Sequence, residues 1–158
     1  MFKKFYNSYL AYVLVYTFYF LSFALFSSLI SVYMLGLGFS AGQTSVVVSV
    51  AFFASMLAQP IMGILNDRLS IKKVTLFSFG AIIFIAIYFM QVRDLLGLTI
   101  GYSLVVMLIN GVNPVMDVLA ARSPYTYGKI RIWGTIGYAL GSQLAGVLYQ
   151  YVSPMAIF

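Results

Sequence analysis

The sequence contains no cysteine and no histidine. Without cysteine the chain can form no disulfide, no zinc ribbon and no thiol nucleophile. Without histidine it lacks the side chain that most often acts as a base near neutral pH, and it has no nitrogen or sulfur ligand pair for a metal. These two absences exclude thiol and histidine chemistry, and we expect no metal site.

Charge is also scarce. The 158 residues include nine basic and three acidic side chains, 63% are hydrophobic, and the mean hydropathy is +1.01. A soluble domain carries about 25% charged residues, whereas this chain carries 8%. So few polar side chains cannot coat a soluble particle of this size. The composition excludes an ordinary cytosolic enzyme, a disordered protein and a secreted disulfide scaffold.

Long apolar runs take the place of the missing charges. A membrane-spanning helix needs about 20 mostly apolar residues. The first run, 9–34, contains no charge and is too long for the core of a signal peptide. We predict an all-α integral membrane protein with five complete transmembrane helices at 9–34, 44–65, 74–91, 95–119 and 132–149. Residues 155–158 resemble the start of a sixth span, so we expect the natural chain to continue beyond Phe158.

The basic residues indicate an orientation, because short loops rich in Lys and Arg stay in the cytoplasm. With a cytoplasmic N-terminus, only Arg93 of the nine basic residues lies outside. The others are Lys3, Lys4, Arg68, Lys72, Lys73, Arg122, Lys129 and Arg131. We therefore predict a multi-pass protein of the inner or plasma membrane, with the lipid bilayer as its partner. Nucleic acid is excluded as a partner, since a nucleic-acid-binding patch would not alternate with apolar runs.

The fourth predicted span has one polar face. A charged side chain at the centre of a bilayer costs at least about 2.5–3.5 kcal/mol, so it usually faces a cavity and has a partner. Asp117 is the one acid within an apolar run. At about 100° per residue, Asn110 and Asn113 lie within about 60° of Asp117.

Arg131 begins the fifth span and also has polar neighbours on its helical face. These neighbours are Thr135, Tyr138 and Ser142. Antiparallel helices joined by a short loop can bring Asp117 and Arg131 together, and we hypothesise an ion pair that lines a water-filled cavity. The alternative is that both residues lie at the cytoplasmic ends of their helices and extend separately into water.

The fifth span also carries a strip of small residues, namely Gly134, Gly137, Gly141 and Ala145. Small residues at this spacing let two helices approach closely, so we predict a packing surface. A nucleotide-binding glycine loop is excluded, because that loop needs a preceding strand.

The acidic residues do not favour an enzyme. Intramembrane aspartyl chemistry needs two acids that face each other, but Asp67 and Asp94 lie in predicted loops on opposite sides of the membrane. Serine chemistry would need a base, and histidine is absent. We therefore predict that the protein is not an enzyme.

Residues 63–73 (GILNDRLSIKK) resemble the signature loop between the second and third spans of the major facilitator superfamily. That pattern has Gly, three residues, Asp, Arg or Lys, then Gly and two or three basic residues. Ser70 stands here where the pattern has its second Gly. The resemblance implies the major facilitator fold and a signature loop that helps to gate the cytoplasmic side. Its matching residues are Gly63, Asp67, Arg68, Lys72 and Lys73.

A second similarity narrows the family. Residues 113–117 (NPVMD) and 127–140 (YGKIRIWGTIGYAL) resemble the region of spans 4 and 5 in the oligosaccharide:proton symporters. Residues 18–20 and 59–60 are similar to that family as well, so the resemblance covers nearly the whole chain. Residues 131–137 also resemble the nucleoside:proton symporters, which remain the alternative.

The resemblance implies the N-terminal bundle of a twelve-span transporter that takes up a di- or oligosaccharide with protons by alternating access. The proton gradient would be its energy source, without a cofactor. Asp117 and Arg131 would hold sugar hydroxyls, Tyr138 would stack on the sugar ring, and Phe20 would line the cavity. From their helical faces we add Asn113 and Thr135.

The same resemblance places the proton-coupling residues in a C-terminal half, which would be a partner of this bundle. The 158 residues alone are therefore expected to transport nothing.

Overall fold

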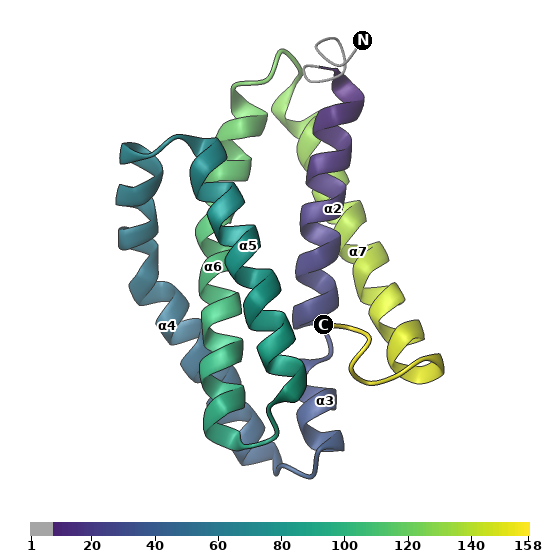
Figure 1. Ribbon diagram of the computed structural model, residues 1–158. Coiled ribbons are helices and arrows are strands. Elements are labelled where there is room, and N and C mark those ends of the chain that lie inside the picture. Colours follow the sequence, from purple (N-terminus) through teal and green to yellow (C-terminus); the bar gives the residue numbers. More distant parts are fainter. Residues whose placement is uncertain (1–7) are drawn as a thin grey trace. The chain divides into compact units, whose positions relative to one another are not determined.

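The computed structural model describes residues 8–158, apart from the side chains at positions 66, 71 and 72. Within that part of the chain all regular secondary structure is α-helical (Figure 1). The helices are α2 (Tyr9–Ser27), α3 (Ile30–Gly36), α4 (Ala41–Arg68), α5 (Ile71–Gln91), α6 (Leu95–Ala121) and α7 (Tyr127–Tyr151). Among residues 8–158, four stretches are long and apolar enough to cross a membrane, namely Tyr9–Gly36, Ala41–Leu65, Lys73–Gln91 and Leu95–Ala121. The predicted all-α membrane class is confirmed.

Helix α7 contains the predicted fifth span but is not one of these four stretches. Its glycines and polar residues lower its hydropathy. With 25 residues and a rise of about 1.5 Å per residue, it is still long enough to cross a bilayer. Its crossing therefore stays a prediction from the sequence.

The first predicted span, 9–34, lies within the stretch Tyr9–Gly36, which consists of two helices. Helix α2 ends at Ser27, and α3 begins at Ile30. The Ser27 hydroxyl donates a hydrogen bond of 2.7 Å to the carbonyl oxygen of Phe23, one turn earlier. Serine hydroxyls that bond the preceding turn compete with the backbone ladder and bend helices, and hydropathy alone does not register this.

Two other predicted boundaries differ from the structure. Helix α4 continues to Arg68 and α5 begins at Ile71, so most of the predicted charged loop at 66–73 is helical. Residues 155–157 form a turn, and no helix begins at 155–158. A helix needs several residues to form its first hydrogen-bonded turn, and four residues are too few to offset that cost.

The chain divides into two compact units. Unit 1 combines Met1–Leu29 with Met116–Ile157, and unit 2 combines Ile30–Val115 with Phe158. In unit 1, α2 packs along α7 (Figure 1). A β-carbon added at Gly141 would lie 2.5 Å from the carbonyl oxygen of Leu21, so the two helices touch backbone to backbone. The predicted packing role of the small residues is confirmed.

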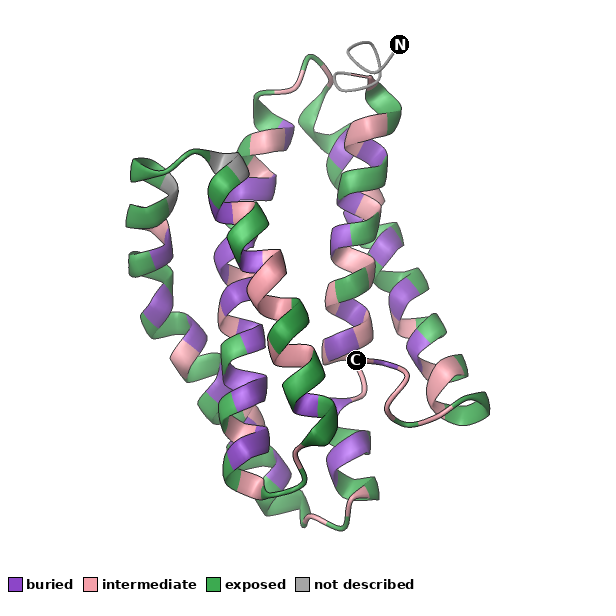
Figure 2. Cartoon of the chain, in the orientation of Figure 1, coloured by how far each residue is buried: buried purple, intermediate pink, exposed green. Residues whose placement is uncertain are grey.

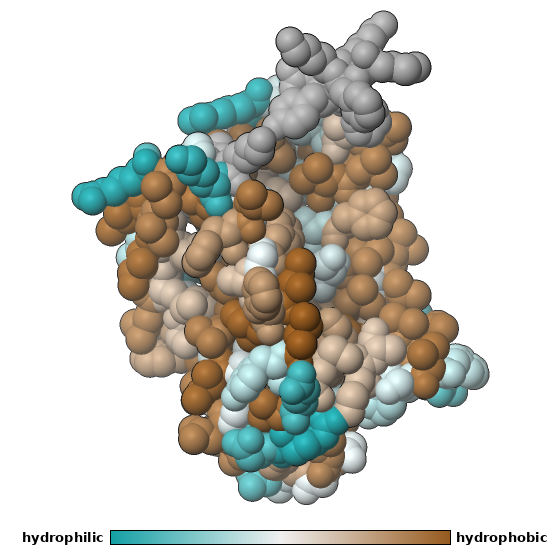
Figure 3. Space-filling view, viewed as in Figure 1, coloured by the Kyte–Doolittle hydropathy of each residue, from teal (hydrophilic) through white to brown (hydrophobic). Residues whose placement is uncertain are grey.

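In unit 2, α5 presents large apolar side chains outward. Leu76, Phe77 and Phe84 are 71%, 74% and 76% exposed. Figure 2 shows the many exposed residues of this helix, and Figure 3 shows the hydrophobic surface of the same view. An apolar surface of this kind is unfavourable in water but suits the lipid of a membrane.

Candidate functional site

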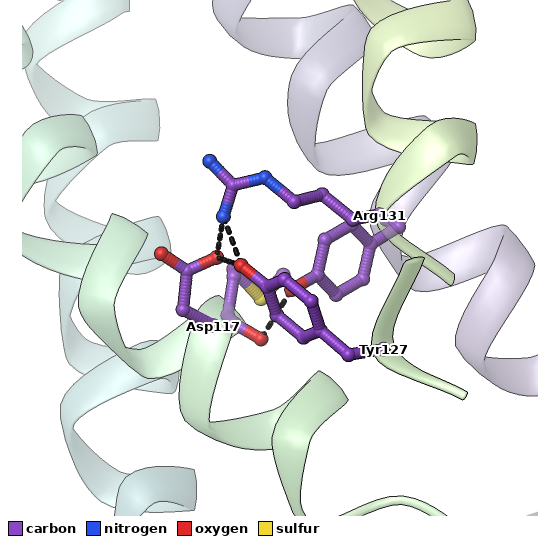
Figure 4. Close-up of polar contacts among 5 residues, drawn as sticks. Asp117, Tyr127 and Arg131 are labelled. Carbon is purple, nitrogen blue, oxygen red and sulfur yellow. Dashed lines mark hydrogen bonds and ion pairs between the residues drawn. The ribbon is translucent and has the colours of Figure 1, made fainter. Parts of the chain in front are cut away.

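Three side chains of unit 1 form a polar cluster, which we define as Asp117, Tyr127 and Arg131 (Figure 4). Asp117 lies near the end of α6, and the other two lie in the first turns of α7. Because Tyr127 and Arg131 are four residues apart, they share one face of α7. Arg131 Nη1 donates to Asp117 Oδ1 at 2.5 Å. The predicted pairing of these two charges is confirmed.

Tyr127 is the member of the polar cluster that sequence reasoning missed. Its hydroxyl donates to Asp117 Oδ1 at 3.0 Å and accepts a hydrogen bond from Arg131 Nη1. Its ring centroid lies 5.5 Å from Arg131 Cζ, which allows a cation–π contact. The four-residue spacing of Tyr127 and Arg131 was the signal that could have identified it.

The polar cluster is accessible. The side chains of Arg131 and Asp117 are 53% and 47% exposed. Among the described residues, nothing bonds to Asp117 Oδ2 or to Arg131 Nε and Nη2. The free carboxylate oxygen can accept a hydrogen bond from a ligand hydroxyl, and the free guanidinium nitrogens can donate to one. Both kinds of hydrogen bond are charge-assisted. The direct pair at 2.5 Å differs from the alternative in which each charge extends separately into water.

Helix α2 holds the backbone around the polar cluster. The buried Tyr16 hydroxyl donates to the carbonyl oxygen of Met116 at 2.5 Å, next to Asp117. The Tyr9 hydroxyl donates to the carbonyl oxygen of Lys129 at 3.0 Å and accepts from Trp133 Nε1 at 3.0 Å. These bonds fasten α2 to the end of α6 and to the first turns of α7, which bear the cluster.

The other predicted site residues of unit 1 lie on α2 and α7. Phe20 is half-buried, and its ring packs over Gly134. Thr135 is exposed one turn after Arg131. Tyr138 is 40% exposed, and its ring meets Phe23 edge to face at 5.9 Å. Their roles toward a ligand stay predictions.

Asn113 belongs to unit 2, where it is part of a ladder, that is, a series of side-chain hydrogen bonds. Its Nδ2 donates to Asn110 Oδ1 at 3.3 Å. Asn110 Nδ2 in turn donates to the Ser55 hydroxyl at 2.9 Å, which links α6 to α4. This ladder gives Asn110 a structural role that its place on a polar face did not predict. A ligand contact by Asn113 stays a prediction.

We expect Asn110→Ala to lower the free energy of unfolding by about 1 kcal/mol, the usual size of a hydrogen bond between membrane helices. Ser55→Ala breaks only the bond to Asn110 and should cause a smaller loss, whereas Asn110→Ala also removes the acceptor of the Asn113 amide. The double variant should lose little more than Asn110→Ala alone, because both changes break the bond between Asn110 and Ser55. Denaturant titration of the purified protein measures these losses. Ser103→Ala on α6 is the matched control, since the Ser103 hydroxyl is buried without a hydrogen-bond partner among the described residues. Additive losses from Asn110→Ala and Ser55→Ala would contradict the link.

The signature-loop residues lie at the turn between α4 and α5. Gly63, Asp67 and Arg68 belong to the end of α4, and Lys73 lies in the first turn of α5. The side chain of Lys72 lies outside the described residues, as do Lys3 and Lys4. Ser70 has φ −66° and ψ 139°, an extended conformation that needs no glycine. Serine therefore fits this turn without strain, and the role of the loop in gating stays a prediction.

Comparison with known proteins gives one family over the whole chain. Residues 2–158 match the family described as LacY proton/sugar symporter. The chain is 29% identical over 122 residues to a lactose permease of Citrobacter freundii, covering 70% of this chain and 29% of that protein. Its identity to the Escherichia coli raffinose permease is 29% over 133 residues, covering 77% and 31%.

The Escherichia coli sucrose permease is 29% identical over 162 residues, covering 94% of this chain and 39% of that protein. The chain thus spans between 29% and 39% of the length of these three relatives. No solved structure gives a significant match.

Proposed function

Because the chain belongs to the LacY proton/sugar symporter family, we propose that the natural protein containing it takes up a di- or oligosaccharide together with protons. The relatives are named for lactose, raffinose and sucrose, which supports a sugar of this size. The observation that carries the proposal is the accessible polar cluster, whose Asp117–Arg131 pair has atoms left to bind a ligand. None of these three names refers to a nucleoside.

Each ligand role follows from the chemistry of the side chain. Asp117 accepts hydrogen bonds from sugar hydroxyls, and Arg131 donates to them. The exposed ring of Tyr138 packs on the apolar face of the sugar ring. Thr135, Asn113 and Phe20 contribute further polar and aromatic contacts in this proposal.

The transport cycle belongs to the whole protein. In such transporters two related halves rock around a site near the middle of the membrane. We propose that the proton gradient supplies the energy without a cofactor, and that the rest of the protein supplies the second half and the proton coupling. The N-terminus and the signature loop would lie on the cytoplasmic side of the plasma membrane. The 158 residues alone are expected to transport nothing.

The test is proton movement in de-energised cells that express the natural full-length protein. We expect the medium to become alkaline when a disaccharide is added, because sugar and protons enter together. The response should disappear in Arg131→Ala, which removes the donor of the polar cluster. Arg122→Ala is the matched control, because Arg122 is exposed in the loop after α6. A response to nucleosides and to no sugar would overturn the proposal.

A further inference from the structure

Asp117 and Arg131 use only part of their bonding capacity on each other. A carboxylate and a guanidinium commonly form two parallel hydrogen bonds, with both oxygens and two nitrogens engaged. Within the part of the chain that the structure describes, Arg131 bonds through Nη1 alone and Asp117 through Oδ1 alone. In Figure 4 the dashed lines between the three labelled residues meet at these two atoms and at the hydroxyl of Tyr127.

The Tyr127 hydroxyl explains this one-to-one bond. It accepts from the same nitrogen of Arg131 and donates to the same oxygen of Asp117 that form the ion pair. Both groups are thereby turned so that their other atoms remain unbonded among the described residues. The remaining acceptor is Asp117 Oδ2, and the remaining donors are Arg131 Nε and Nη2.

We propose that Tyr127 is a positioning residue for sugar binding. Its hydroxyl keeps the ion pair in the one-to-one arrangement, and the unbonded atoms then bind two neighbouring hydroxyls of one sugar ring. The acceptor and donors belong to groups in direct contact at 2.5 Å, which suits hydroxyls on adjacent carbons better than hydroxyls far apart. This inference rests on the proposed function.

Removal of the hydroxyl should weaken sugar binding without removing any direct ligand. In Tyr127→Phe the ring over Arg131 is retained, but the guanidinium is free to turn and form the second bond to Asp117. The sugar must then break that bond before it binds. From the usual strength of hydrogen bonds to charged groups, we expect the half-saturating sugar concentration to rise about tenfold. The maximal rate should stay within about twofold, because the atoms that bind the sugar are still present.

The experiment compares sugar-dependent uptake by the natural full-length protein and its variants over a range of disaccharide concentrations. Tyr151→Phe is the matched control, since it also removes one tyrosine hydroxyl and Tyr151 is 75% exposed at the far end of α7. We expect its half-saturating concentration to equal that of the unaltered protein. An unchanged half-saturating concentration in Tyr127→Phe would overturn the inference. So would a lower maximal rate at unchanged half-saturation, because it would indicate a structural role.

A second pair of variants tests the hydroxyl without the ring. Glutamine can accept from Arg131 and donate to Asp117, whereas leucine of similar size can do neither. Tyr127→Gln should therefore reach half-saturation at a concentration at least about threefold lower than Tyr127→Leu. Equal values would again overturn the inference. If the unaltered protein binds no sugar, the proposed function itself fails, and that result is distinct from normal sugar binding that ignores Tyr127.

Discussion

Arg131→Lys should lower the affinity of the natural full-length protein for its sugar by about 100-fold, although the positive charge is kept. Arginine presents a rigid planar fork, so Nη1 can hold Asp117 and Tyr127 while Nε and Nη2 remain for the ligand. The ammonium of lysine is a single point with three donors. It cannot bond to Asp117 and Tyr127 and also present a separate edge to two sugar hydroxyls. Calorimetric titration with a disaccharide measures the loss.

Arg122→Lys is the control for this substitution, because it makes the same chemical change at an exposed position in the loop after α6. Its affinity for the disaccharide should match that of the unaltered protein. A normal affinity in Arg131→Lys would show that charge alone suffices at this position. It would contradict the role of the guanidinium fork and leave the fold assignment intact.

The Asp117–Arg131 pair could be predicted because a buried charge in lipid is costly and needs a partner. Sequence spacing placed both residues near helix ends joined by a short loop, and the structure joins them at 2.5 Å. Tyr127 was not predicted, because tyrosines near the ends of membrane helices are common and most of them face the interface. Only the orientation of α7 in the structure shows that the Tyr127 hydroxyl bonds to the carboxylate of the pair.

The helices themselves were largely predictable from hydropathy, whereas their interruptions and partners were not. At the break after Ser27, the Ser27 hydroxyl bonds to the preceding turn, which hydropathy does not register. The bond between Ser55 and Asn110 depends on which helices become neighbours in unit 2. Periodicity in one helix shows which face is polar, but it does not show which residue of another helix will meet that face.

The contact between α2 and α7 should be the most sensitive part of unit 1 to added volume. A β-carbon at Gly137 would overlap the carbonyl oxygen of Thr17 and would lie 2.9 Å from the α-carbon of that residue. Backbone atoms cannot rotate aside as a side chain can, so the helices would have to separate. We expect Gly137→Ala to lower the free energy of unfolding by about 3 kcal/mol, near the upper end of the usual cost of overpacking. Unfolding titration of the purified full-length protein in a denaturing detergent measures the change.

Two other glycines of α7 allow the cost of added volume to be compared between positions. At Gly134 the added β-carbon would meet the ring of Phe20, which can shift, so the loss should be smaller than at Gly137. At Gly146 it would meet nothing within 4 Å, and Gly146→Ala should be neutral or slightly stabilising. All three substitutions replace glycine with alanine in the same helix, so their effects on helix propensity are similar. Differences among their free energies of unfolding therefore measure the contact with α2. Equal stability of Gly137→Ala and Gly146→Ala would mean that α7 does not pack against α2 in this way. The hydrogen bonds from α2 would then not explain how the backbone around the polar cluster is held in place.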